Sequence, residues 1–131
     1  MIADRVTIDC NYPYDTEITT GGTIIVSPNY PYAYKPDKDC RTTIKFGFSN
    51  RIRIKFLNFE VEQHPRCDYD YLAIYDGRNE NSRQIGPKLC GEIRPAPVQS
   101  TGNTMHILFR TDSSGQHTGF QIQVMKIGNA I

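Results

Sequence analysis

The chain has 131 residues, which suffices for one domain with a single hydrophobic core and is too short for two. Hydrophobic residues make up 38% and charged residues 22%, a balance that excludes a disordered chain, and no apolar run approaches the roughly 20 residues of a transmembrane helix. The formal net charge of +1 argues against nucleic acid as the main partner, because domains that bind nucleic acid usually carry a clear basic excess.

The residue types favour strands over helices. The sequence has 15 Ile, 5 Val and 11 Thr but only 5 Ala and 4 Leu, and it adds 8 Tyr and 6 Phe. β-Branched and aromatic side chains pack well on a pleated sheet, and the 10 Gly and 8 Pro supply turns. An all-β protein is therefore expected, and no window shows a helical period.

Apolar alternation and turn-forming residues divide the chain into short strands. The predicted strands, in chain order, are residues 23–27, 40–48, 51–56, 71–75, 104–110 and 120–127. The segments between them are rich in Gly, Pro, Asn and Ser, and no internal repeat or long linker splits the chain. Many short strands separated by such turns predict a jelly-roll-like β-sandwich.

The strands at 40–48 and 51–56 show the alternation most clearly. In the first, Phe48 shares the inward face with the other even-numbered residues, and Arg41 lies on the outward face. The turn signal between the two strands predicts that they form a hairpin. At residues 57–59 the apolar phase shifts by one residue, which a strand can do only through a bulge, a bend or an exit from the sheet.

The four cysteines are far apart in the sequence. They are Cys10, Cys40, Cys67 and Cys90. Their separations of 30, 27 and 23 residues exclude the close pair of a zinc or redox site, so two disulfides are expected, in any of three pairings. Disulfides imply an oxidising, extracellular compartment, whereas four reduced and buried cysteines are the alternative. Residues 1–6 do not form a signal peptide, and we expect a piece of a longer precursor with Met1 as an artificial start.

Acidic residues cluster in loop-like segments on both sides of Cys67 and after the predicted strand at 104–110. They are Glu60, Glu62, Asp68, Asp70 and Asp112. A disulfide at Cys67 would hold the acids before it and the acids after it near one another. Glu62, Asp70 and Asp112 can then converge at one end of the sandwich. Three close carboxylates repel one another unless a cation lies among them, and Ca²⁺ suits such a site better than Mg²⁺, which demands octahedral geometry. Solvated acids on surface loops are the alternative.

Catalytic motifs are absent from the sequence. The three histidines, His64, His106 and His117, are isolated, and there is no HExxH helix or GxSxG elbow. Glu62 and Asp70 could form a glycosidase pair, but a sandwich of 131 residues with short loops has little material for a substrate cleft. A protein without enzymatic activity is therefore expected.

A basic stripe lies on the outward face of the predicted strand at 51–56. Arg51, Arg53 and Lys55 alternate there with apolar residues. Such a stripe can attract a sulfated polysaccharide, and the solvated face of a sheet is the alternative.

A series of motifs follows a fixed order along nearly the whole chain. Besides the four cysteines, they are GTIIVSPNYP at 22–31, FEVE at 59–62, CDYDYL at 67–72, DG at 76–77, LCG at 89–91, FRTDSS at 109–114 and GF at 119–120. Together they resemble the CUB domain family over residues 10–127, which leaves residues 1–9 as an N-terminal extension or artificial start and 128–131 as a C-terminal tail. The resemblance implies a β-sandwich of two antiparallel sheets with the disulfides Cys10–Cys40 and Cys67–Cys90.

Many CUB domains bind one Ca²⁺ at one end of the sandwich, and the resemblance implies which residues would do so here. The implied ligands are the side chains of Glu62, Asp70 and Asp112 and a backbone carbonyl of Ser113 or Ser114. The resemblance also implies that Tyr34 makes a hydrogen bond to Glu62. In such domains the ion orders the loops, and its carboxylates keep lone pairs that can accept a lysine or arginine of a partner protein.

The resemblance thus predicts an extracellular CUB module, without catalytic activity, that binds one structural Ca²⁺ and a basic side chain of another protein. We expect it to belong to a larger secreted protease, receptor or matrix-associated protein. The alternative is a free-standing, spermadhesin-like CUB protein that binds carbohydrate or glycosaminoglycan through Arg51, Arg53 and Lys55. Neither nucleic-acid binding nor membrane insertion is expected.

Overall fold

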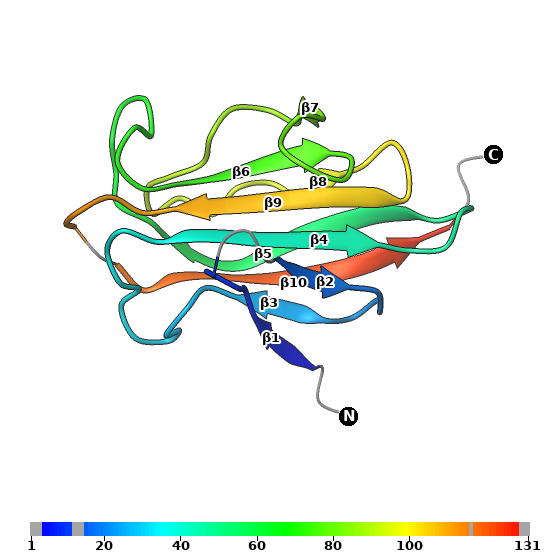
Figure 1. The fold of residues 1–131 in the computed structure, drawn as a ribbon, viewed down its shortest axis with the longest axis horizontal. Helices are drawn as coiled ribbons and strands as arrows, with labels where there is room; N and C mark the ends of the chain where they lie inside the picture. Colours follow the sequence, from blue (N-terminus) through cyan, green and yellow to red (C-terminus); the bar gives the residue numbers. More distant parts are fainter. Residues whose placement is uncertain (1–3, 12–14, 116, 129–131) are drawn as a thin grey trace.

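Ten strands form two five-stranded sheets that pack face to face in the computed structural model (Figure 1), which describes residues 4–11, 15–115 and 117–128. The strands are β1 (Arg5–Thr7), β2 (Thr16–Ile18), β3 (Ile24–Val26), β4 (Asp39–Lys45), β5 (Arg51–Glu60), β6 (Tyr71–Asp76), β7 (Arg83–Gln84), β8 (Val98–Gln99), β9 (Thr104–Arg110) and β10 (Gly119–Ile127). The predicted β-sandwich is therefore confirmed. The described part of the chain contains no helix that could serve as a membrane span.

One sheet has the strand order β1-β3-β10-β5-β8, and the other has the order β2-β4-β9-β6-β7. Pairing is antiparallel except at one edge of each sheet, where β1 runs parallel to β3 and β2 runs parallel to β4. The six predicted strands correspond to β3, β4, β5, β6, β9 and β10. The other four strands have only two or three residues each, which is too short for alternation to show in the sequence.

The predicted hairpin between β4 and β5 is wrong. β4 lies between β2 and β9, whereas β5 lies between β10 and β8 in the opposite sheet. Both strands have one apolar face, and the two faces bury each other only if the strands lie in different sheets. The chain therefore crosses between the sheets after β4 ends at Lys45. Phe48 lies in this connection and is 99% exposed, contrary to its predicted inward position.

The shift of apolar phase near residue 57 is a β-bulge. β5 pairs with β10 so that Gln121 lies opposite Asn58 and Ile122 opposite Phe56, which leaves Leu57 as the extra residue. Phe59 returns to the core and is only 7% exposed. The bulge therefore lets one long strand continue to Glu60, directly before the predicted site.

The core lies between the two sheets and ends in a group of aromatic rings. Tyr34 packs edge-on against Phe109 with ring centroids 5.1 Å apart, and Phe109 packs edge-on against Phe120 at 5.0 Å. All three side chains are buried. Edge-to-face packing of this kind fixes ring orientation and adds about 0.5–1.5 kcal/mol per pair beyond area burial. The Tyr34 hydroxyl is thereby held at the end of the sandwich.

Two disulfides join Cys10 to Cys40 and Cys67 to Cys90. This pairing confirms the one that the resemblance implied. The first disulfide attaches the segment between β1 and β2 to β4, and the second attaches the loop before β6 to the segment after β7.

Arg41 lies on the outer face of β4, but it is only 7% exposed. Its Nε atom lies 3.0 Å from Asp39 Oδ1 and its guanidinium lies 2.6 Å from Glu80 Oε1. Glu80 belongs to the loop after β6, so this loop contributes a carboxylate to the outer face of the sheet. The outer face of this sheet therefore carries a buried arginine with two carboxylate partners that are more exposed, which alternation alone did not predict.

Candidate metal centre

Three loops meet at one end of the sandwich, the left end in Figure 1. They follow β3, β5 and β9 and connect these strands to β4, β6 and β10. They bring together Glu62, Asp70 and Asp112, whose nearest ligand atoms all lie within 4.8 Å of one another. The three acidic side chains selected from the sequence thus form one cluster.

Asp70 is the buried member of the cluster, with no exposed surface. Its Oδ2 atom accepts a hydrogen bond from the Tyr34 hydroxyl at 2.6 Å, and its Oδ1 atom accepts one from the Asp112 backbone N–H at 2.8 Å. Burial raises the pKa of Asp70 to about 6; these two hydrogen bonds lower the pKa and the Asp112 carboxylate raises it. Two donors therefore orient a carboxylate that remains ionised at neutral pH.

Tyr34 connects two members of the cluster, though not in the predicted way. Its hydroxyl donates to Asp70 and accepts a hydrogen bond from the Glu62 backbone N–H at 3.1 Å. The side-chain bond implied by the resemblance thus goes to Asp70 and not to Glu62. Burial, followed by the hydrogen bond to Asp70, raises the pKa of Tyr34, so the hydroxyl keeps its proton and acts as a donor.

Glu62 presents an oxygen that lacks a hydrogen-bond donor. Its Oε1 atom is buried and has no partner among the described residues. Buried polar atoms are nearly always satisfied, so this oxygen needs a partner. A cation bound between the three carboxylates would supply the missing partner.

Gly115 is a site residue that the sequence analysis missed. It has a φ of +80°, and a Cβ atom at this position would overlap the Glu62 carboxylate. Glycine is therefore required both by the backbone conformation and by the close approach of Glu62. The available signal was a glycine directly after the Asp-Ser-Ser sequence at residues 112–114.

The loop after β9 is held in place at Asp112. The Asp112 carbonyl accepts a hydrogen bond from the Asp37 backbone N–H at 2.8 Å, which connects this loop to the one after β3. Asp112 Oδ1 accepts a hydrogen bond from the Ser114 backbone N–H at 3.2 Å. Ser113 and Ser114 are exposed next to the cluster, and the ligand role of their carbonyls stays a prediction.

Two other acidic residues near the cluster, Glu60 and Asp68, have partners elsewhere. Glu60 Oε1 lies 3.6 Å from His117 Nδ1, and Asp68 Oδ1 lies 4.0 Å from Lys88 Nζ. By contrast, no Lys, Arg or His among the residues described forms an ion pair with any of the three clustered carboxylates. Within the described ranges, the cluster therefore carries negative charge that no ion pair balances.

The donor set indicates which ions would fit. All three side chains offer hard carboxylate oxygens, with no thiolate or imidazole, and this set suits Ca²⁺ or Mg²⁺ better than zinc or copper. The unsatisfied oxygen and the uncompensated charge both fit a bound divalent cation.

The model of the CUB domain family matches residues 10–124 of the chain, which is most of its length. This chain belongs to the CUB domain family. Human tolloid-like protein 1 is 43% identical over 98 residues, which cover 75% of this chain but only 10% of that protein. This CUB domain thus spans about a tenth of the length of this curated relative.

Solved structures have the same fold. The MASP-1 CUB2 domain bound to Ca²⁺ is 33% identical with a TM-score of 0.75, and the alignment covers 84% of this chain and 96% of that one. The full extracellular region of zebrafish Gpr126/Adgrg6 is 30% identical with a TM-score of 0.78, and the alignment covers 92% of this chain and 15% of that one.

Proposed function

We propose that this CUB domain binds one structural Ca²⁺ through Glu62, Asp70 and Asp112. The observation that carries the proposal is the convergence of three carboxylates within 4.8 Å, one of which has a buried oxygen without a hydrogen-bond partner. The similarity to a CUB domain that was solved with Ca²⁺ supports the choice of ion.

Calcium suits the loops better than magnesium does. Ca²⁺ takes six to eight oxygens in flexible geometry, so backbone carbonyls of Ser113 or Ser114 and water can complete its shell. Mg²⁺ demands a near-ideal octahedron and keeps several waters. The bound ion would neutralise the mutual repulsion of the carboxylates and hold the three loops together, which is a structural role and not a catalytic one.

The same carboxylates are proposed to bind a lysine or arginine of a partner protein. Glu62 and Asp112 are partly exposed, so they keep lone pairs that a basic side chain can reach. Two exposed aromatic residues adjoin the site in sequence, Tyr32 at 72% exposure and Tyr69 at 48%. Tyrosine is enriched in protein interfaces, which supports this end of the sandwich as the contact surface.

The domain is proposed to work outside the cell as a non-catalytic part of a larger protein. Its two disulfides persist in an oxidising compartment. A CUB domain of the same fold occurs in an extracellular region, and the alignment with tolloid-like protein 1 covers a small part of that protein.

Calorimetric titration of the chelator-treated domain with Ca²⁺ tests the metal proposal. We expect one-to-one binding that is abolished in Asp112→Ala. Asp68→Ala is the matched control, because Asp68 is an exposed acid in the same loop as Glu62 and Asp70 but is not a member of the cluster. Absence of binding at millimolar calcium, or equal loss in both variants, would overturn the proposal.

The partner proposal has its own probe. The calcium-loaded domain is titrated with a lysine-containing tripeptide and with the same peptide acetylated on lysine, while NMR follows the backbone amides of Glu62 and Asp112. We expect shifts only with the free lysine and only in the presence of calcium. Equal shifts with both peptides would contradict recognition of the lysine charge.

A further inference from the structure

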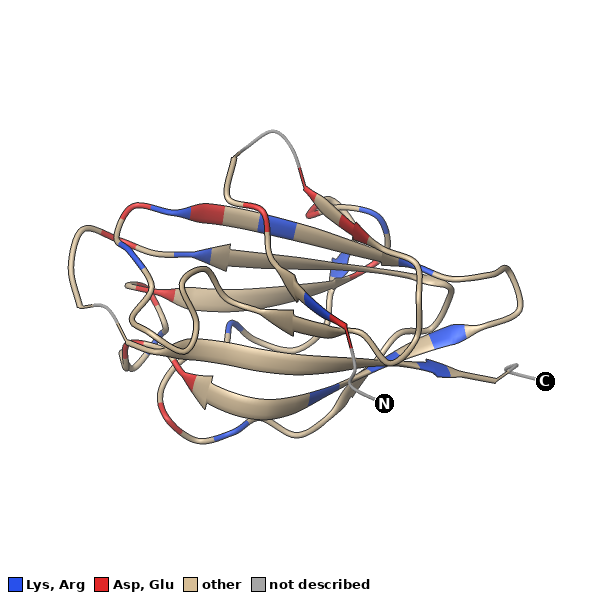
Figure 2. Cartoon of the chain, turned by 90° about the horizontal axis from the view of Figure 1, so that it is seen from below, with Lys and Arg blue, Asp and Glu red and all other residues tan. Residues whose placement is uncertain are grey.

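The sheet β1-β3-β10-β5-β8 has an unusual charge distribution. Glu60 is the only acidic residue in its five strands, and it lies at the loop end of β5. The basic residues of these strands are Arg5, Arg51, Arg53, Lys55 and Lys126. Figure 2 shows blue segments along this layer, whereas blue and red segments are mixed on the other layer.

Most of these basic side chains lie on the outer face of the sheet. Along β5, Arg51, Arg53 and Lys55 alternate with buried isoleucines, so the three point outward about 7 Å apart. Arg5 of β1 lies in one row of paired residues that crosses the sheet to Lys55 of β5. The row passes through Ile24 of β3 and Gln123 of β10. Arg5 therefore lies on the same face, three strands and about 14 Å away from Lys55.

The cations of this face are unpaired, unlike those of the other sheet. No carboxylate of the described residues lies within ion-pair distance of Arg5, Arg51, Arg53 or Lys55. In the opposite sheet, β4, β7 and β9 each have an arginine paired with an aspartate. The outer face of the first sheet therefore carries cations that no described carboxylate pairs with, which gives this face a positive potential.

We propose that this face binds a linear sulfated polysaccharide. Cations at every second residue of one strand complement the repeated anionic groups of such a chain, and the outward Gln121 and Gln123 offer amide donors to its oxygens. The face offers no exposed large apolar side chain within its strands, which argues against a lipid surface. The disulfides imply an oxidising exterior, where sulfated polysaccharides are available and nucleic acid is not the expected ligand.

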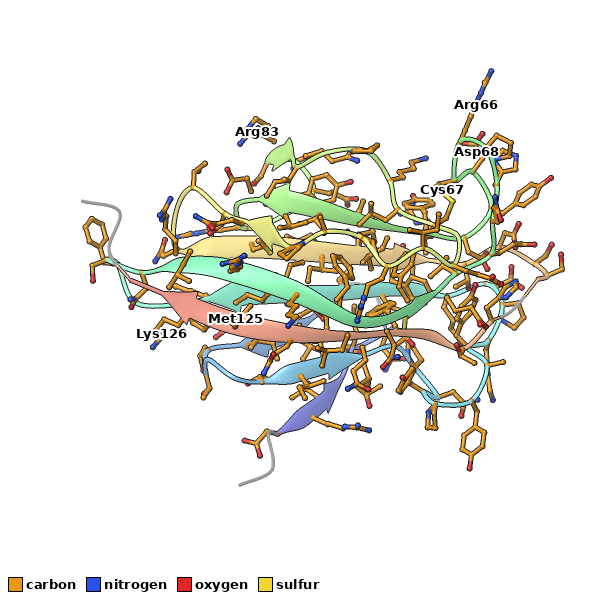
Figure 3. All side chains as sticks on the ribbon, turned by 180° about the vertical axis from the view of Figure 1, so that it is seen from behind. Arg66, Cys67, Asp68, Arg83, Met125 and Lys126 are labelled. Atoms are coloured by element: carbon orange, nitrogen blue, oxygen red, sulfur yellow. A yellow bond between two sulfur atoms is a disulfide. The ribbon has the colours of Figure 1, made fainter. Side chains whose placement is uncertain are left out.

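This face is separate from the candidate metal centre. On β5, Lys55 lies five residue steps before Glu60, about 17 Å, and Arg51 lies nine steps before it, about 30 Å. Figure 3 shows Met125, which pairs with Arg53, toward the end of the sandwich opposite Cys67. Binding at this face is therefore independent of calcium, so its test is separate from that of the proposed function.

The test is titration with a size-defined heparin oligosaccharide, in calcium and in chelator. The test variant is Arg51→Gln/Arg53→Gln/Lys55→Gln, and the control is Arg66→Gln/Arg78→Gln/Lys45→Gln. Both sets contain two arginines and one lysine, and the control residues are exposed positions outside the face. We expect the test variant to lose about tenfold or more in affinity and the control less than about twofold, because local charge density decides the binding.

Further outcomes decide the proposal. Affinity of the wild-type domain should fall steeply with salt and stay the same in chelator. Equal losses in the two triple variants would overturn the proposal, because net charge and not this face would then control binding. Loss of binding in chelator, or binding to phosphatidylserine vesicles without binding to heparin, would also overturn it. Matching circular dichroism spectra and melting temperatures establish that both variants are folded.

Discussion

Replacing Asp112 with asparagine should have opposite effects on the domain with and without calcium. Without an ion, two charges 4.8 Å apart repel by about 1 kcal/mol at a water-like dielectric and by about 3.5 kcal/mol at an effective dielectric of 20. Asp112→Asn removes the repulsion with both Glu62 and Asp70, and the amide oxygen still accepts the Ser114 N–H. Even at the lower bound, the calcium-free variant should gain about 2 kcal/mol, or roughly 6–10 °C in melting temperature.

Thermal melts in chelator and in millimolar calcium measure both effects. The wild-type domain should gain about 2.7 kcal/mol when calcium exceeds its Kd a hundredfold, whereas the variant should gain little. An equal melting temperature for wild type and Asp112→Asn in chelator would refute the repulsion argument. An equal melting temperature for the wild type in chelator and in calcium would refute the metal site itself.

Three further predictions concern the same site. The pKa of Asp70 is raised from 3.8 to about 6, so between these two pH values the folded calcium-free domain binds more protons than the unfolded chain. The free energy of unfolding should therefore fall by about 3 kcal/mol as the pH rises from below 3.8 to above 6. Urea unfolding in chelator measures this fall, and Asp70→Asn should remove it. Gly115→Ala should weaken calcium binding about tenfold or more, because the added Cβ would overlap Glu62. Gly86 also has a positive φ, +68°, but has open space around it, so Gly86→Ala should affect only stability, by about 1–2 kcal/mol. Unchanged calcium affinity in Gly115→Ala would contradict this prediction. Tyr34→Phe should lower the free energy of unfolding by about 1–3 kcal/mol in chemical denaturation, because Asp70 and the Glu62 N–H lose a buried partner. A loss below about 0.5 kcal/mol, the size of a neutral surface change, would show that the Tyr34 hydroxyl does not stabilise the site.

Local sequence pattern was sufficient for six of the ten strands and for the buried face of β5. Side chains alternate with period two in any strand, so Ile52, Ile54 and Phe56 marked the buried face of β5 before its partners were known. The break in that period at residues 57–59 predicted a bulge, a bend or an exit from the sheet, and the pairing with β10 shows that it is a bulge at Leu57. The motifs around the cysteines also led to the family, the disulfide pairing and the three acidic residues.

Only the tertiary structure decided which strands are neighbours and what the site residues contact. An amphipathic strand can bury its apolar face in either sheet, so alternation could not show that β4 and β5 belong to opposite sheets. The partner of Tyr34 and the need for Gly115 depend on distances of a few ångströms between loops that are far apart in the sequence. These distances are set by how the two sheets pack, and no local pattern contains that information.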